Sequence, residues 1–173
     1  MIICLFLKNC ENSNKAKTYR ILKTTEKKQS RESTFKQDII TFDVPDSWIQ
    51  SDPTPMRLAS FLVPYSDGNG DLSVIKLAGD GGGLQANVNR WRRQLDKSSI
   101  TLSEIEEDIY FHKGKLGEFK IIEIYNLEKD FNFLCAIIST NNQTLFIKLS
   151  ITKLGLVESK SDFIHFISSI DYN

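Results

Sequence analysis

The chain has 173 residues, of which 40% are hydrophobic and 25% are charged, a balance typical of one folded domain with a sizeable core. Its 22 Lys and Arg side chains match its 22 Asp and Glu side chains, and a net charge of zero argues against a dedicated nucleic-acid-binding protein. No stretch approaches the roughly 18 consecutive apolar residues of a membrane-spanning helix, which excludes a channel or transporter.

The charge is unevenly distributed, because residues 1–37 hold nine Lys or Arg side chains against three Asp or Glu side chains. Residues 11–34 are also rich in Asn, Ser, Thr and Lys and poor in large apolar side chains. That composition is typical of a solvated segment. We therefore expect residues 1–34 to form an apolar start followed by a basic, flexible tether, and residues 35–173 to form a single α/β domain.

The extreme N-terminus has the order of a bacterial lipoprotein signal: an apolar stretch over residues 2–7, then Cys10, then a polar spacer over residues 11–15. In such signals the cysteine becomes the lipid-modified first residue of the mature chain. Three features depart from this pattern. The apolar stretch is shorter than the usual length of about 7 to 15 residues. No basic region precedes the apolar stretch, and Lys8 and Asn9 stand where small residues are usual. Two locations stay open: the periplasmic face of the cell envelope with Cys10 as the lipid anchor, or the cytoplasm.

The cysteines and histidines do not form a recognisable metal or redox motif. Cys4, Cys10 and Cys135 lack CxxC spacing, and His112 has no neighbouring His or Cys in the sequence. His165 is expected on the exposed face of a helix. Cys135 also lies in an apolar run, where a thiol behaves as a small buried hydrophobe. We therefore expect no metal, no disulfide framework and no cofactor.

The first predicted elements are three strands. Residues 40–44 alternate apolar and polar side chains, as in a half-buried strand, and Pro45 ends the pattern. All four prolines fall within residues 45–64, which predicts an irregular connection before the next strand. Two further strands are expected over residues 56–63 and 72–78, with a hairpin turn over residues 66–71.

A helix is predicted over residues 82–95, because Leu84, Val88, Trp91 and Leu95 follow the spacing of one helical face. A second helix is predicted over residues 160–170, with Ser159 and Asp162 as a capping box and His165 on the outer face. The predicted inward face of the second helix consists of Phe163, Phe166, Ile167 and Ile170.

Between these two helices the pattern predicts four more strands, over residues 109–113, 118–125, 132–139 and 144–151. The connections between them are too short for parallel crossovers, so neighbouring strands are expected to be antiparallel. The predicted fold class is α+β: a mostly antiparallel sheet flanked by helices.

The unusual segment of the chain is its glycine-rich stretch, which lies between a predicted strand and a predicted helix. Such a stretch can cradle an anion with backbone N–H groups, but it lacks the spacing and the Lys-Ser/Thr pair of known phosphate loops. Asp80 also places a carboxylate there, which can cap the helix instead. Two interpretations stay open: a tight turn that packs the helix on the sheet, or a site for an anion or small ligand.

Two interpretations stay open for the polar side chains of the helix after the glycines: hydrogen bonds to the sheet edge or to neighbouring loops, or recognition of a carboxylate or an acidic partner. Asn87, Arg90 and Gln94 form a stripe beside its apolar face, and Arg92 and Arg93 point away from that face. The candidate residues for binding a ligand or a partner are Gly79, Asp80, Gly81, Gly82, Gly83, Asn87, Arg90, Arg92 and Arg93.

A resemblance to a known group of proteins rests on two segments, RLASF at residues 57–61 and GDGGGLQANVNRWR at residues 79–92. They resemble bacterial envelope proteins that share a GDxGGLxANVNRWR-type segment, and residues 45–48 are similar to the P-x-x-W corner of that group. The likeness covers residues 42–170. It implies the Mog1/PsbP-like fold, an α/β/α sandwich, and often a lipoprotein anchor, but no reaction.

Three functions are therefore open. The first is a non-enzymatic accessory or binding module, tethered to the envelope, that uses the face over residues 79–93 to contact a protein partner or small ligand. The second is a carrier of a small molecule or anion in a pocket between helix and sheet. The third is an enzyme that uses Glu104, Glu106, Glu107 and Asp108, although contiguous acids without a catalytic signature are usually solvated. No nucleic-acid partner is expected, and a membrane contact only through a lipid anchor.

Overall fold

The computed structural model describes residues 17–20, 40–52 and 54–173. Its strands are β1 (Lys17–Arg20), β2 (Ile40–Val44), β3 (Ile49–Ser51), β4 (Ala59–Tyr65), β5 (Gly68–Ala78), β6 (Tyr110–Gly114), β7 (Gly117–Ile124), β8 (Asn132–Ser139), β9 (Gln143–Ile151) and β10 (Asp171–Tyr172). Its helices are α1 (Leu84–Gln94), α2 (Leu102–Glu107) and α3 (Lys153–Ser169).

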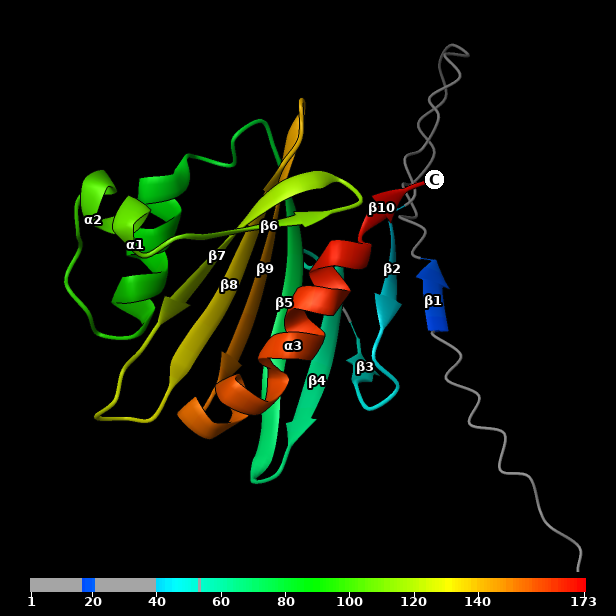
Figure 1. Ribbon diagram of the computed structural model, residues 1–173, viewed down its shortest axis with the longest axis horizontal. Helices are drawn as coiled ribbons and strands as arrows, with labels where there is room; N and C mark the ends of the chain where they lie inside the picture. Colours follow the sequence, from blue (N-terminus) through cyan, green and yellow to red (C-terminus); the bar gives the residue numbers. More distant parts are fainter. Residues whose placement is uncertain (1–16, 21–39, 53) are drawn as a thin grey trace, which may run out of the picture.

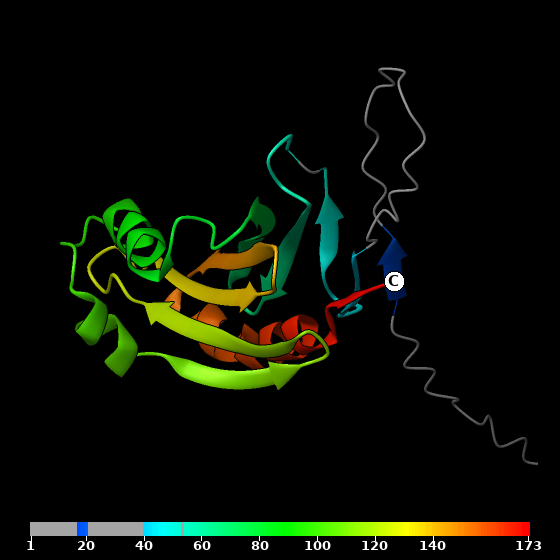
Figure 2. The same cartoon turned by 90° about the horizontal axis from the view of Figure 1, so that it is seen from above.

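The central element is a seven-stranded sheet in the order β3-β4-β5-β9-β8-β7-β6, in which every neighbouring pair is antiparallel. A small sheet in the order β1-β2-β10 lies beside it. Figures 1 and 2 show α3 on one face of the large sheet and α1 with α2 on the other. The structure thus confirms the predicted α+β class with an antiparallel sheet between helices.

Both faces of the sheet are buried in its middle, because side chains alternate between the two faces of each strand. On β8, Leu134, Ala136 and Ile138 belong to the core beneath α3, whereas Cys135 and Ile137 belong to the core beneath α1 and α2. This explains the nearly continuous apolar run of β8, which is typical of a strand covered on both sides. Cys135 is fully buried, as predicted.

The core beneath α3 is centred on an aromatic cluster. The Phe166 ring lies 5.1 Å from that of Phe42, 5.2 Å from that of Trp48 and 5.7 Å from that of Phe61 (centroid distances). Trp48 enters this cluster through a tight turn, in which its N–H donates to the Pro45 carbonyl at 3.0 Å. The P-x-x-W corner therefore joins β2, β4 and α3.

The core beneath α1 confirms the predicted apolar face of that helix. Val88, Trp91 and Leu95 are at most 5% exposed, and the half-buried Leu84 packs against them. Helix α2 was not predicted: Thr101 caps it by accepting from the Glu104 N–H, and Glu104 reaches back to the Thr101 N–H. Its acidic side chains face solvent, and its one buried residue is Ile105, so its apolar signal in the sequence is weak.

Helix α3 is longer than predicted, and its predicted capping box is wrong. It begins at Lys153, where the Thr152 hydroxyl accepts from the Gly155 N–H at 3.2 Å, and Ser159 is a buried residue within the helix. Gly155 conceals this first part of the helix in the sequence, since glycine disfavours helices. Here it is required by close packing, because an added Cβ would lie 2.5 Å from Ile151 Cγ1. His165 is exposed, as predicted.

The hairpin after the proline-rich segment also differs in detail. Strand β4 begins at Ala59 rather than at residue 56, and β5 begins at Gly68, so the turn is shorter than the predicted residues 66–71. Tyr65 pairs with Gly68, which leaves Ser66 and Asp67 as a two-residue turn. The short strand β3 was not predicted, because three residues are too few for a periodic signal.

Strand β1, which pairs with β2, lies within the predicted tether. The other residues of that segment, Cys10 among them, lie outside the described residues, so the tether stays a prediction. None of the helices in the described ranges is both long and apolar enough to cross a membrane.

The aromatic cluster gives a first testable prediction. Phe166→Ala should lower the free energy of unfolding by about 3–5 kcal/mol, because it removes a ring that is fully buried among three others. His165→Ala on the same helix should change it by less than about 0.5 kcal/mol, because that side chain is exposed. Urea unfolding followed by circular dichroism measures both, and equal losses would contradict the described orientation of α3.

Candidate functional site

A hollow with both apolar and cationic walls lies between α1 and the sheet and has a volume of about 330 Å³. We call it the α1 groove. Its walls come from α1, from the loop before β4, and from β5 and β9. The lining residues are Met56, Arg57, Ser73, Ile75, Leu77, Arg90, Trp91, Gln94, Phe146 and Lys148.

The strand register places the groove at the edge of the area that α1 and α2 cover. Ser60, Ser73, Lys148 and Cys135 stand opposite one another on β4, β5, β9 and β8. Cys135 belongs to the core beneath the helices, whereas no residue of β4 does. Lys148 therefore lies where this face of the sheet changes from apolar side chains to the buried polar side chains of Ser73 and Ser60.

The floor and inner wall of the groove are apolar. Trp91 and Phe146 are each 5% exposed and meet edge to face, with ring centroids 6.1 Å apart. Ile75 and Leu77 of β5 are half-buried beside them. Such a surface removes the apolar part of a ligand from water.

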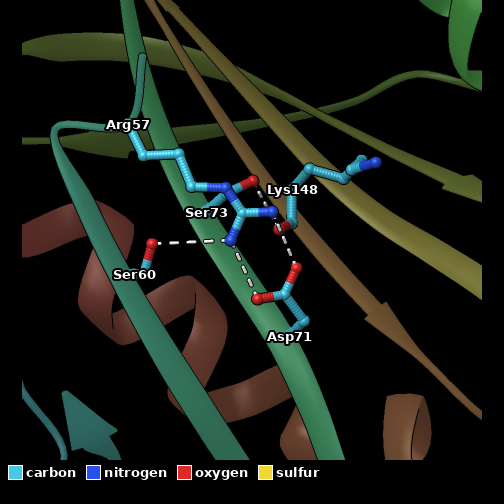
Figure 3. A network of polar contacts seen from close by, with 5 residues as sticks. All are labelled: Arg57, Ser60, Asp71, Ser73 and Lys148. Carbon is cyan, nitrogen blue, oxygen red and sulfur yellow. Dashed lines mark hydrogen bonds and ion pairs between the residues drawn. The ribbon is translucent and has the colours of Figure 1, made fainter. Parts of the chain in front are cut away.

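Arg57 reaches the groove from the loop before β4. The Arg57 N–H donates to the Thr54 carbonyl at 2.9 Å, and the Leu58 N–H donates to the Val74 carbonyl of β5 at 2.7 Å. Figure 3 shows the guanidinium lying over β5, where it forms two hydrogen bonds of 2.9 and 3.0 Å to the Asp71 carboxylate. This two-point contact fixes the plane of Arg57 and neutralises its charge locally.

Lys148 is a half-buried lysine whose described contacts are all uncharged. Its Nζ atom donates to Gln94 Oε1 at 2.8 Å and lies 4.2 Å from the centroid of the Phe133 ring. In Figure 3 its side chain points away from the Asp71 carboxylate. Burial lowers the pKa of Lys148, and the nearby charges of Arg57 and Arg90 lower it further, whereas Cys135 and Asp71 act in the opposite direction.

Arg90 is the third cation of the groove. Its side chain is exposed and donates to the Asn87 carboxamide oxygen. Among the described residues, neither Arg90 nor Lys148 has a carboxylate within ion-pair distance. Two of the three cations therefore have only neutral partners.

The predicted glycine segment forms a closed turn beside the groove. Asn87 is buried, and its Nδ2 donates to the carbonyls of Gly81 and Gly83 at 3.0 and 2.7 Å. The N–H groups of the four glycines also donate hydrogen bonds within the protein. Their acceptors are the Asn142 carbonyl for Gly79, the Ala78 carbonyl for Gly81, Asp80 Oδ1 for Gly82 and the Asp80 carbonyl for Gly83. These donors have acceptors already, which favours the tight-turn interpretation over the anion cradle.

The nine candidate residues are thus divided by the structure. Arg90 lines the groove, and Asn87 links Arg90 to the glycine turn. Arg92 and Arg93 do not line the groove: Arg92 Nε donates to the Ser98 carbonyl at 2.7 Å, and Arg93 is exposed. Asp80 closes the turn and makes no side-chain cap to α1.

Sequence reasoning missed Arg57 and Lys148. A lysine on a strand with many apolar neighbours is a weak signal, because it becomes unusual only once β9 is known to be a central strand. Its site depends on β9 pairing with both β5 and β8. Arg57 lies in the proline-rich connection, where no periodicity predicts the direction of a side chain.

Other candidate chemistry is not assembled in the described part of the chain. No group of three His, Cys, Asp or Glu side chains is placed there as a metal ion would require. The Thr101 hydroxyl and N–H lower the pKa of Glu104 by hydrogen bonding, which is a capping role. Burial raises the pKa of the Cys135 thiol, which makes it a poor nucleophile.

Comparison with known proteins yields a structural likeness only. No protein-family model matches the chain, and no curated protein matches it. The solution structure of cyanobacterial PsbP (CyanoP) from Synechocystis sp. PCC 6803 is 16% identical, with a TM-score of 0.51 over 96% of this chain and 99% of that one. This chain therefore has a PsbP-like fold, as the resemblance implied.

A second solved structure, of a protein from Bacteroides thetaiotaomicron, is also 16% identical, with a TM-score of 0.49. The match covers 78% of this chain and 45% of that protein, so this chain spans less than half of its length. The predicted membership in the envelope group with the GDxGGLxANVNRWR-type segment stays a prediction.

The glycine turn gives a second testable prediction. Gly79 and Gly81 both have left-handed backbone angles, with φ of 59° and 65°, but an added Cβ meets nothing within 4 Å at Gly79 and lies 2.4 Å from Phe146 Cε2 at Gly81. Gly79→Ala should therefore cost about 1 kcal/mol of unfolding free energy. Gly81→Ala should cost about 2–4 kcal/mol, because the Phe146 ring must also move. Equal costs in urea unfolding would show that Gly81 does not pack on Phe146.

Proposed function

We propose that this protein is a non-catalytic binding module that takes an anion-bearing small ligand in the α1 groove. The observation that carries the proposal is the composition of that groove. Among the described residues, its lining contains three cations, Arg57, Arg90 and Lys148, and no carboxylate. Asp71, just outside the lining, pairs with Arg57, so Arg90 and Lys148 are the two lining cations without a counter-ion in the described part of the chain. An apolar floor with a few convergent charged groups is the usual make-up of a small-molecule site.

The electrostatics of Lys148 support an anionic ligand. A half-buried ammonium without a counter-ion is costly, and its lowered pKa reflects that cost. An anion in the groove compensates this charge through a charge-assisted hydrogen bond. An anionic ligand thus provides the counter-ion for Lys148 that the described residues of the protein do not supply.

A binding role fits the groove better than catalysis does. Within the described residues, the groove lining contains no His, Cys, Asp or Glu that could exchange a proton with a reacting group beside Lys148. The acidic residues considered in the sequence lie on or next to α2 and do not line the groove. The PsbP-like fold leaves the function open, so the proposal depends on the groove.

An aromatic sulfonate tests this proposal. The dye 8-anilinonaphthalene-1-sulfonate combines an apolar body with one fixed negative charge, and we expect saturable binding by the native protein. Lys148→Met and Arg90→Gln should each weaken binding about tenfold, because each removes a charged hydrogen-bond donor. Arg93→Gln, on the same helix but outside the groove, is the matched control and should leave binding unchanged.

Fluorescence titration gives the dissociation constants, and thermal melting by circular dichroism shows that each variant is folded. Binding that is equally strong in Lys148→Met, Arg90→Gln and Arg93→Gln would contradict the proposed site. So would the absence of saturable binding by the native protein.

We also propose that the module is held at the cell envelope through Cys10, the position at which the N-terminal segment resembles a lipoprotein signal. We expect the full chain to partition with membranes and Cys10→Ala to appear in the water-soluble fraction. Mass spectrometry of the N-terminal peptide should show a lipid-modified Cys10. An unmodified Cys10 in the mature protein, or an unchanged distribution of Cys10→Ala, would contradict the anchor.

A further inference from the structure

We propose that the ligand of the α1 groove is an amphiphilic monocarboxylate, with its carboxylate between Arg90 and Lys148 and its aliphatic chain on the apolar floor. This inference rests on the proposed function and names the ligand class. It follows from the distribution of charge in the groove, the shape of the apolar surface and the position of Gln94.

The position of the ligand's carboxylate is inferred from which of the three cations already have a carboxylate partner in the protein. Arg57 is held by two hydrogen bonds to Asp71, whereas Arg90 and Lys148 contact neutral groups. Gln94 lies one helical turn after Arg90 and accepts from Lys148 through Oε1. Its amide nitrogen can therefore donate to a ligand placed between Arg90 and Lys148.

The number of charges favours a carboxylate. Of the three cations in the groove lining, Arg90 is exposed and Arg57 is paired with Asp71, so Lys148 is the half-buried one that lacks a counter-ion within the described residues. One negative charge balances it, whereas a phosphate dianion would leave excess negative charge on an apolar floor. A planar carboxylate also accepts from a guanidinium and an ammonium at once.

The apolar floor of the groove indicates the chemical nature of the ligand's body. Ile75, Leu77, Trp91 and Phe146 present aliphatic and aromatic surface without polar groups, apart from the indole N–H. Met56, which is 76% exposed, stands at the rim, where its flexible thioether can cover a chain. The volume of about 330 Å³ lies near the lower end of small-molecule pockets and favours a medium-length chain.

Binding of a carboxylate should be linked to the protonation of Lys148. The groups that act on its charge are Arg90 of α1, Arg57 of the preceding loop, Asp71 of β5 and Cys135 of β8. The pKa of Lys148 is lowered in the unliganded protein, and a bound carboxylate raises it again. Affinity is therefore full below the unliganded pKa and falls as the pH rises through it.

Isothermal titration with octanoate, octanol and acetate tests the ligand class. Octanoate should bind, octanol should bind at least about tenfold more weakly, and acetate should show no detectable binding. Affinity should rise about fourfold for each methylene added from butanoate to octanoate. Lys148→Met should weaken octanoate binding about tenfold and Arg93→Gln should not.

The conservative variant Lys148→Arg separates charge from structure. It should keep octanoate binding but lose its decline at high pH, since arginine stays protonated throughout. Octanol binding should not depend on pH in any variant. These two readouts would not change if Lys148 only stabilised the fold.

The possible failures are distinguishable. Octanol binding as tightly as octanoate would overturn the head-group position, and octyl phosphate binding more than about tenfold tighter would replace the carboxylate by a phosphate. If octanoate fails to displace the sulfonate dye while Lys148→Met still weakens dye binding, the ligand class is wrong and the proposed function stands. If the dye itself does not depend on Lys148 and Arg90, both proposals fail.

Discussion

The contact between Trp91 of α1 and Phe146 of β9 determines where the helix lies, and the groove depends on it. One side of this ring pair belongs to the core beneath α1 and α2, and the other forms the wall of the α1 groove. Because Arg90 and Gln94 are on the same helix as Trp91, their distance from Lys148 is set by the same packing. A core interaction thus fixes the geometry of the charged groups.

The glycine turn makes that packing possible. Gly81 passes so close to Phe146 that a Cβ would overlap the ring, and Asn87 ties the turn to the first part of α1. The conspicuous glycines of the sequence therefore serve the structure, and they affect binding only by placing α1. Arg90, the residue that Asn87 contacts at the groove, is where the turn and the proposed site meet.

Local patterns in the sequence were sufficient for much of the fold. The 3.6-residue spacing in α1 and the boundaries of β8 agree with the structure, because both depend on short-range periodicity. The beginning of α3 was missed because Gly155 argues against a helix unless its packing on Ile151 is known. Two of the three cations in the groove were missed for a similar reason: Lys148 and Arg57 come near Arg90 only through the pairing of β5 with β9.

The most direct test of the account uses the fluorescence of Trp91 alone. The chain contains two tryptophans, so Trp48→Phe leaves Trp91 as the only indole. Because Trp91 is 5% exposed and lines the groove, its emission should be blue-shifted, resist quenching by acrylamide and change in intensity when octanoate is added. Red-shifted, readily quenched emission from the folded variant would show that α1 does not pack its tryptophan on the sheet, and the groove with its proposed ligand would be lost with it.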